Sequence, residues 1–427
     1  MPDVVIIGGG VTGIQAALDL ANHGIDVHLV EREPSIGGHM AMLDKTFPTN
    51  DCSMCILSPK MMDVYRHPRI HTHTCARVSA ISGEAGHFSV TITKMPRYID
   101  EERCNGCGDC IEVCPVEVYN RFDAGIGVRK AIYKPHQQAV PDIVIKDPEH
   151  CIECGLCYDV CGREAIRKED FGQEFVVDAA SVIIACGYDV FDAANKEQFH
   201  YLRFADVITS LEFERMMNAS GPTGGMIRRL SDGTTPRSIV FVQCVGSRDM
   251  QLGRPYCSGV CCMYAIKNAI LIKEKYPETE VTILYMDIRA YGKGYEEYYQ
   301  RAVDAGVHFV RGLPAEILDR GDTLALRVEN TESGEILDLK PELVVLSVGL
   351  QASIDSGDIA TLFGIPREDT GFLKPLDDKI ETVATIRPGI YLAGTATQPR
   401  DIPDCVAHAG AAAMRAFLDA NKDGSSR

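Results

Sequence analysis

The feature that most constrains this chain is a pair of cysteine runs with the same internal spacing. Each run reads C-x-x-C-x-x-C-x-x-x-C, with cysteines at 104, 107, 110 and 114 and again at 151, 154, 157 and 161. Thiolates at this spacing hold [4Fe–4S] clusters, and the fourth cysteine of each run binds the cluster of the other run. The pattern therefore predicts one cluster on Cys104, Cys107, Cys110 and Cys161, and a second on Cys151, Cys154, Cys157 and Cys114. Zinc is the alternative, but zinc sites rarely need so many cysteines at a repeated spacing.

The total of 17 cysteines in 427 residues favours metal or redox chemistry over a disulfide scaffold, because the number is odd and Met1 to Ile7 lacks the features of a signal peptide. No apolar run approaches the ~20 residues of a membrane helix. We therefore expect a cytoplasmic protein without a transmembrane segment. The formal net charge of −17 argues against nucleic-acid binding, which uses a basic surface.

A glycine loop stands near the start of the chain. Gly8, Gly10 and Gly13 form G-x-G-x-x-G between an apolar strand at 4–7 and a helical pattern at 14–21, and Glu31 follows a second strand at 27–30. Such glycines allow a tight turn and close approach of a pyrophosphate, while the acid accepts hydrogen bonds from ribose hydroxyls. The arrangement predicts a dinucleotide site; a glycine turn without a ligand is the alternative.

A segment near the end of the chain favours FAD over NAD. Gly389 to Thr395 precedes an alanine-rich helical pattern at 406–419. This resembles the second flavin-contacting segment of the thioredoxin reductase group, in which Gly-Asp usually stands where this chain has Gly394-Thr395. A helix-capping loop is the alternative. The flavin residues we expect are Gly8, Gly10, Gly13, Glu31, Gly38, Gly187, Gly394 and Thr395.

These motifs predict an α/β fold: a two-dinucleotide-domain, thioredoxin reductase-like flavoprotein with an inserted α+β ferredoxin module that holds two clusters. The FAD-binding domain is expected in three parts, at 1–98, at 169–235 (which includes a linker) and at 341–427. The ferredoxin module is expected at 99–168, and a second dinucleotide-type domain at 236–340.

Four further cysteines lie where a nicotinamide enzyme would have its second glycine loop. Cys244 follows an apolar strand at 239–243, and Cys257, Cys261 and Cys262 come soon after it, but no G-x-G-x-x-G is present. From spacing alone, a third cluster and a set of buried structural thiols are both open interpretations. Cys52 and Cys55 form a C-x-x-C pair that could be a redox disulfide, half of a cluster completed by a partner, or two buried thiols.

The chain as a whole resembles the A-type subunit of heterodisulfide reductase, which is the flavin and iron–sulfur component of that enzyme. Beyond the ferredoxin-type runs, the matching stretches are VEREPSIGG at 30–38, DCSMC at 51–55, PRYID at 96–100, VITSLEFER at 207–215, QCVGSRD at 243–249, CCMYA at 261–265, YMDIR at 285–289 and PRDIP at 399–403. In this family the set of Cys244, Cys257, Cys261 and Cys262 is similar to a third, non-standard [4Fe–4S] site beside the flavin. The resemblance therefore implies FAD and three clusters.

The resemblance also implies a role. We expect an oxidoreductase: the FAD and iron–sulfur electron-transfer subunit of a heterodisulfide reductase-like complex. Its flavin would be the branch point of electron bifurcation between a low-potential ferredoxin-type acceptor and a disulfide-type acceptor. The alternative is a non-bifurcating relay subunit of a quinone-interacting oxidoreductase-type complex. No side chain is expected to act as catalytic acid, base or nucleophile.

Long family members carry further modules before the glycine loop and after the alanine-rich helix. The chain begins at that loop and ends after that helix, so we expect a short form that works in a hetero-oligomer. The expected partners are other heterodisulfide reductase-like subunits and an electron-input subunit, with ferredoxin as a further candidate.

Overall fold

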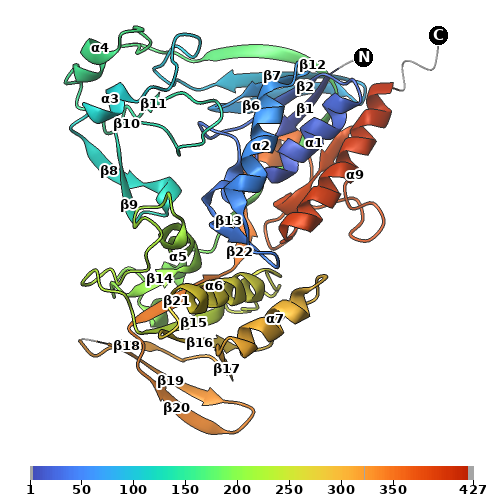
Figure 1. Cartoon of the computed structure of the whole chain (residues 1–427). Coiled ribbons are helices and arrows are strands. Elements are labelled where there is room, and N and C mark those ends of the chain that lie inside the picture. Colours follow the sequence, from blue (N-terminus) through green and yellow to red (C-terminus); the bar gives the residue numbers. More distant parts are fainter. Residues whose placement is uncertain (1–2, 322, 422–427) are drawn as a thin grey trace. The chain divides into compact units, whose positions relative to one another are not determined.

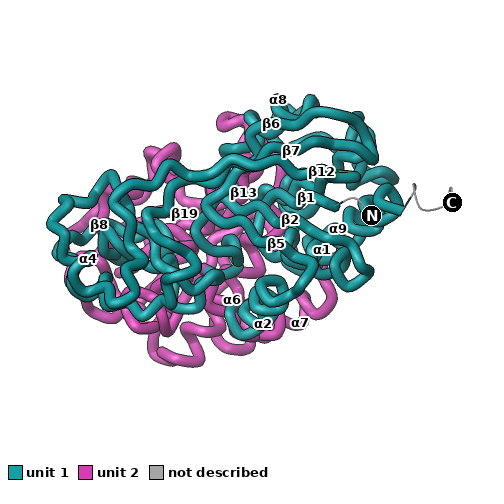
Figure 2. The backbone as a smooth tube through the Cα atoms, turned by 90° about the horizontal axis from the view of Figure 1, so that it is seen from above, with its two compact units in different colours: residues 1–41, 54–188, 352–427 teal, residues 42–53, 189–351 magenta. Residues whose placement is uncertain are grey.

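Two structural units share this chain in the computed structural model, which describes residues 3–321 and 323–421 (Figure 1). Unit 1 contains residues 1–41, 54–188 and 352–427, and unit 2 contains residues 42–53 and 189–351 (Figure 2). Each unit is therefore assembled from segments that lie far apart in the sequence. The boundaries of the five predicted segments remain a prediction.

A seven-stranded sheet organises unit 1, with strand order β5-β2-β1-β12-β7-β6 and β23 pairing with β12. The strands are β1 (Asp3–Ile7), β2 (Val27–Val30), β5 (Ile70–His73), β6 (Ala76–Glu84), β7 (His87–Lys94), β12 (Gln173–Ile184) and β23 (Ile390–Leu392). The helices of this unit outside the ferredoxin-type segment are α1 (Val11–Asn22), α2 (Ser53–Arg66, whose first residue is assigned to unit 2), α8 (Ser356–Phe363) and α9 (Ile402–Asn421).

Strand β12 joins two kinds of pairing in this sheet. Its first half pairs antiparallel with β7, and its last residues pair parallel with β1 and with β23. The run from Ala179 to Ile184 is buried throughout, as expected of a strand covered on both faces. The adjacent strands β6 and β7 pair antiparallel, as a hairpin, and β7 joins this hairpin to β12.

Helices α1 and α9 pack together over this sheet (Figure 1). Ile14 and Ala17 of α1 share a core with Ala409, Ala412 and Ala416 of α9, and the small alanines allow close approach. Helix α9 begins four residues earlier than the predicted helix at 406–419. Two features explain the earlier start. The proline in the first turn is tolerated, because an N–H at that position would have no partner within the helix. The Asp401 carboxylate also caps the helix, since it accepts the Asp404 N–H at 2.9 Å.

The segment with the two cysteine runs forms a small layered module within unit 1. Its elements are α3 (Asp109–Glu112), β8 (Glu117–Asn120), β9 (Gly127–Lys130), β10 (Ile132–Tyr133), β11 (Ile145–Lys146) and α4 (Leu156–Val160). Ile99, Cys110, Ile132 and Val144 form its core. Ile99 bridges to Ile166, so the chain enters and leaves the module at one place.

Unit 2 is built on a five-stranded parallel sheet with strand order β14-β21-β15-β16-β17. The strands are β14 (Val207–Thr209), β15 (Ser238–Val245), β16 (Glu280–Tyr285), β17 (His308–Arg311) and β21 (Leu343–Val348), and the helices are α5 (Ser210–Met217), α6 (Cys261–Lys275) and α7 (Tyr295–Asp304). A three-stranded antiparallel sheet adds β18 (Ile317–Asp319), β19 (Leu324–Asn330) and β20 (Glu335–Leu339). Two short pairs are also present: β3 (Lys45–Thr46) with β4 (Asp51–Cys52), and β13 (Tyr188–Val190) with β22 (Leu350–Ala352). The first residue of β13 and the last residue of β22 are assigned to unit 1.

Residues 42–53 are anchored to unit 2 by buried charged side chains. Lys267 is 1% exposed, pairs with the Glu214 carboxylate and donates to the Lys45 carbonyl at 3.1 Å. Arg215, also buried, donates to the Met42 carbonyl at 3.0 Å. Buried charges persist only when they are paired, so these contacts fix the segment that leads to Cys52.

None of the helices within 3–321 and 323–421 has the length and apolar character needed to cross a membrane.

Candidate functional site

The glycine loop has a backbone that only glycine fits at two points. Gly8 has φ +108°, and a Cβ added there would lie 2.2 Å from the Ala185 carbonyl oxygen. A Cβ on Gly13 would lie 1.9 Å from the Gly8 carbonyl oxygen. Strand β1, the loop and α1 therefore pack closely enough for a ligand's phosphates to approach the backbone at the start of the helix.

Glu31 lies against this loop at the end of β2. Its side chain is buried, and its two carboxylate oxygens accept the Gly9 N–H at 2.6 Å and the Glu33 N–H at 2.8 Å. Burial raises the pKa of this carboxyl above its usual value, although the two N–H donors oppose that change. Gly38 joins the same place, since a Cβ on it would lie 2.9 Å from the Gly10 Cα.

The predicted C-terminal segment reaches the glycine loop. Gly394 has φ +63°, and a Cβ there would lie 2.3 Å from the Thr12 hydroxyl oxygen on the first turn of α1. Thr395 is buried beside it. Gly187 also has a positive φ, of +76°, but open space surrounds it. The structure thus brings Gly394 together with the loop that holds Gly8, Gly10 and Gly13.

His408 on α9 also lies in this region, and none of the sequence motifs pointed to it. Its Nδ1 accepts the Gly394 N–H at 2.9 Å, which requires a neutral ring with the proton on Nε2. Burial, with Arg400 nearby, lowers the pKa of His408 to about 4. The only available signal was a histidine within an alanine-rich helix, and that pattern does not identify its partner.

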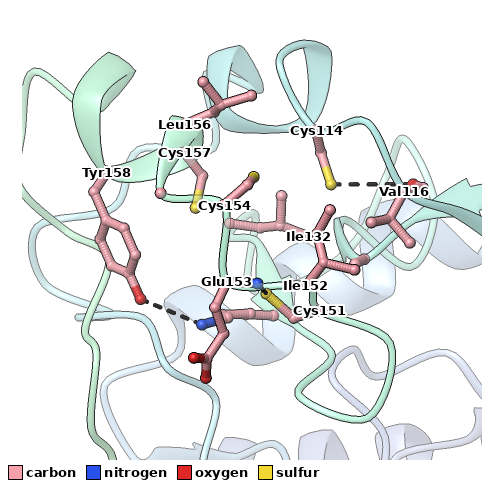
Figure 3. Close-up of a pocket in the computed structure, with 13 residues that line it drawn as sticks. Cys114, Val116, Ile132, Cys151, Ile152, Glu153, Cys154, Leu156, Cys157 and Tyr158 are labelled. Carbon is pink, nitrogen blue, oxygen red and sulfur yellow. Dashed lines mark hydrogen bonds between the residues drawn. The ribbon is translucent and has the colours of Figure 1, made fainter.

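The ligands predicted for one cluster converge on a single cavity. Cys114 from the first run and Cys151, Cys154 and Cys157 from the second all line it, and Figure 3 shows their side chains around this hollow. Ile132 and Leu156 contribute apolar walls. All four cysteines are free thiols, so their sulfur atoms can bind iron.

Three cysteines predicted for the other cluster also lie near one another. The pKa of the Cys110 thiol is raised to about 12. Burial is the largest cause, and the charges of the nearby Cys104 and Cys107 come next. Cys161 comes directly after α4, and its sulfur accepts the Ala165 N–H at 3.4 Å. These cysteines are free thiols as well.

The third cysteine set gathers at the carboxyl end of β15, next to β21. Burial raises the pKa of Cys244 to about 12, and Cys262 and Cys257 add to the increase. Burial also raises the pKa of Cys261. The nearby charges of Cys244, Cys262 and Cys257 raise it further, by smaller amounts. Open parallel sheets bind ligands at a strand end of this kind, where the strand order reverses.

Two cysteines differ from the rest. Cys52 and Cys55 are disulfide-bonded, whereas the other cysteines are free. Both are exposed: Cys52 ends β4, directly before α2, and Cys55 lies in the first turn of that helix. Because both residues are exposed, they are not a pair of buried thiols. They can still be a redox disulfide or half of a cluster that a partner completes.

One charged side chain near the clusters was also missed. Lys146 on β11 is 6% exposed and lines the cavity of Cys114, Cys151, Cys154 and Cys157. Nothing in the cysteine spacing points to it, because the pairing of β10 with β11 brings it there.

Two protein families match parts of the chain. The family described as "4Fe-4S dicluster domain" matches residues 103–166, and the family described as "FAD dependent oxidoreductase" matches residues 3–52. FAD and [4Fe–4S] clusters are therefore the cofactor types of these segments, and the free thiols and the glycine-only backbone described above fit them.

Several curated proteins from methanogens are similar over nearly the whole chain. The chain is 54% identical to the iron-sulfur subunit termed A 2 of the CoB–CoM heterodisulfide reductase of Methanopyrus kandleri, over 96% of this chain and 63% of that protein. It is 51% identical to the A-type subunit of the H2:CoB-CoM heterodisulfide,ferredoxin reductase of Methanothermobacter marburgensis, over 97% of this chain and 63% of that protein. The chain thus spans 63% of the length of these relatives.

Two thioredoxin reductases of known structure share this fold. Lactococcus lactis thioredoxin reductase superposes with a TM-score of 0.54 at 16% identity, covering 98% of this chain and 99% of that one. The T. acidophilum thioredoxin reductase gives a TM-score of 0.53 at 14% identity, covering 99% of each chain. Together with the dicluster match, these similarities confirm the predicted thioredoxin reductase-like α/β fold with a ferredoxin-type module.

Proposed function

The chain belongs to the family of A-type heterodisulfide reductase subunits, and on that premise we propose that it is the FAD and iron–sulfur electron-transfer subunit of a heterodisulfide reductase-like complex. The observation that carries the proposal is the meeting of Cys114 with Cys151, Cys154 and Cys157 at one cavity in a chain that also has the glycine loop. FAD handles two electrons and the clusters take them singly, so such a chain can split electron pairs.

The spacing of the sulfur atoms supports clusters rather than zinc. Thiolates around one tetrahedral zinc ion lie about 3.8 Å apart, given a Zn–S bond of ~2.3 Å. Within the described ranges, no three cysteine sulfur atoms lie within 4.8 Å of one another. A cluster suits the wider spacing, because each thiolate binds a different iron atom.

We propose a third [4Fe–4S] cluster on Cys244, Cys257, Cys261 and Cys262. Two observations support it: the four thiols are free, and they gather at the strand end where a Rossmann-type domain binds its ligand. This assignment leaves the domain around β15 without a nicotinamide site.

We further propose that the flavin is the branch point between a low-potential ferredoxin-type acceptor and a disulfide-type acceptor. The support is indirect: the Methanothermobacter marburgensis relative is named as part of a heterodisulfide,ferredoxin reductase. A relay that does not bifurcate is the competing outcome of the experiment below.

The expected partners are the remaining heterodisulfide reductase-like subunits and an electron-input subunit. Cys52 and Cys55 are the candidate contact zone, because both are exposed and a partner could approach or complete a redox centre there. Replacing both by serine should weaken partner co-purification and electron transfer from flavin to partner. Wild-type levels of both would contradict the contact-zone assignment.

The function is tested on the native complex, purified anaerobically with its co-eluting subunits identified. We expect electrons from a reductant oxidised at the electron-input subunit to be divided at a fixed ratio between heterodisulfide reduction and ferredoxin reduction. Heterodisulfide reduction without any ferredoxin reduction would support the relay instead. If the isolated chain reduced a small disulfide as fast as the complex, the subunit role would be contradicted.

A further inference from the structure

We propose that Lys146 raises the reduction potential of the cluster held by Cys114, Cys151, Cys154 and Cys157, so that this cluster is the more easily reduced of the two in the ferredoxin-type module. The inference rests on the proposed function, which supplies the two clusters. It adds a direction of electron transfer within the module, from the cluster of Cys104, Cys107, Cys110 and Cys161 to the cluster near Lys146.

Lys146 is held in place beside the predicted ligands. It lies on β11, paired with Ile132 of β10, and its N–H donates to the Arg97 carbonyl at 3.2 Å. Its ammonium group donates to the Tyr158 hydroxyl at 3.2 Å and lies 5.5 Å from the centre of the Tyr98 ring. These contacts keep a cation at the wall of the cavity that the four cysteines line.

The charge of Lys146 is not cancelled by a close carboxylate. Among residues 3–321 and 323–421, no carboxylate oxygen pairs with its ammonium nitrogen within 4.0 Å; its partners are the Tyr158 hydroxyl and two aromatic rings. The neighbouring Asp147 binds Arg129 at 2.7 Å and His150 at 3.0 Å instead. Glu153 lines the same cavity but is exposed, so water screens its charge.

Cations near the other proposed cluster are, in contrast, paired with a carboxylate or exposed to water. Arg163, two residues after Cys161, is exposed and donates to the Arg103 carbonyl at 3.3 Å. Lys134 donates to the Gly106 carbonyl at 3.1 Å and binds the Asp142 carboxylate at 2.7 Å. Arg103, next to Cys104, lies 3.7 Å from the Glu164 carboxylate, and both side chains are largely exposed. The two clusters therefore lie in different fields, and the unpaired buried cation faces only one of them.

The physical effect has a definite sign. Reduction adds one electron to a cluster and makes its net charge more negative, with no bond formed and no proton required. A fixed positive charge stabilises that reduced form more than the oxidised form, and the effect is stronger in a buried site, where water screens it less. Lys146 therefore shifts one of the two clusters to a more positive potential.

The test is a redox titration of the full chain, purified anaerobically and followed by electron paramagnetic resonance, with Lys146→Met. We expect the equilibrium constant for reduction of one module cluster to fall about tenfold, a shift of about −59 mV for a one-electron step. The other cluster should not move. Lys146→Arg should keep the wild-type potential, because it keeps the charge.

Lys130→Met is the matched control, since it removes one positive charge from the same module. Lys130 binds the exposed Glu117 carboxylate at 2.9 Å and does not line the cavity, so neither cluster should shift. Cys154→Ala, which should lose the cluster near Lys146, identifies which signal belongs to it.

Three outcomes separate the possibilities. If Lys146→Met keeps its iron and both potentials stay at wild-type values, the inference is wrong and the proposed function stands. If the wild-type module binds no clusters, the proposed function itself fails. If Lys146→Met loses iron, Lys146→Gln provides the test, because it removes the charge and keeps an N–H donor for the Tyr158 hydroxyl. The same signal should move to a more negative potential, and an unmoved signal would contradict the inference.

Discussion

Cys114 lines the same cavity as Cys154, although the two residues belong to different cysteine runs. In the proposed ligand assignment, this exchange of the fourth ligand ties the two halves of the module together. It also means that loss of Cys114 should affect the cluster of the second run and leave the cluster of its own run with all its ligands.

We therefore predict that Cys114→Ala loses about four of the ~12 iron atoms that three cubane clusters would give each chain. Iron and sulfide assays after anaerobic purification provide the measurement. Cys75→Ala is the control, because Cys75 is a buried free thiol outside the three sets, and it should keep the full iron content. A total near eight iron atoms per chain in the wild type would contradict the proposed third cluster.

Gly13→Ala should abolish FAD binding. The added Cβ would lie 1.9 Å from the Gly8 carbonyl oxygen and 3.1 Å from the carbonyl carbon, and these main-chain atoms cannot move away as the end of a flexible side chain could. We expect the flavin content, measured by absorbance after denaturation, to fall at least tenfold. Gly410→Ala is the matched control on α9: its Cβ would meet only the Asp19 carboxylate, at 3.6 Å, and alanine favours a helix. Equal flavin content in the two variants would contradict the assigned site.

The meeting of Cys114 with the second cysteine run, and the glycine loop between its strand and its helix, could be predicted because their signals are local. Cluster chemistry fixes the spacing between neighbouring cysteines, and the loop needs its strand, glycines and helix in immediate succession. Even the crossover of Cys114 follows from that spacing. Element boundaries were less predictable: α9 begins at Ile402 because Asp401 caps a first turn that contains a proline, before the alanine pattern starts.

Lys146 and His408 could not be predicted, because their roles depend on contacts between distant segments. The β10–β11 pairing carries Lys146 to a wall formed by residues of both runs. His408 meets Gly394 only because α9 folds back on the 310 turn at Gly394–Ala396. No periodicity of polar or apolar residues encodes either contact.

His408 should make the flavin domain sensitive to acid. Its folded-state pKa is lowered to about 4 from an ordinary value of 6.5, so the unfolded chain takes up the proton first as pH falls. Stability from the neutral ring is thus fully present above pH 6.5 and is lost as pH falls towards 4, by at most about 3 kcal/mol.

His408→Gln should show a smaller drop in unfolding temperature between pH 7 and pH 5 than the wild type. His28 and His73 also have lowered pKa values but are present in both proteins, so the difference isolates His408. Parallel curves would contradict this prediction.

NADH or NADPH alone should not reduce the flavin rapidly. Cys244 and its neighbours occupy the end of β15, and Cys244-Val245-Gly246-Ser247-Arg248 stands where a nicotinamide domain would have its second glycine loop. Stopped-flow absorbance of the flavin band measures the rate, and dithionite serves as the positive control. Fast bleaching by either nucleotide without partner subunits would contradict this prediction and would indicate a nicotinamide-dependent reductase.

The Lys267–Glu214 pair should be needed for the stability of unit 2. Both side chains are almost fully buried, and Lys267 also holds the Lys45 carbonyl in the segment that leads to Cys52. Lys267→Met leaves the Glu214 carboxylate buried without its cation, which typically costs about 3–5 kcal/mol. We expect a marked drop in the thermal unfolding midpoint, whereas Lys293→Met at an exposed position should change it little.

The double variant Lys267→Met with Glu214→Leu should recover most of the loss, because it removes both charges and retains apolar volume. If the double variant were no more stable than Lys267→Met, the loss would come from the missing contact to Lys45 and not from the unpaired carboxylate.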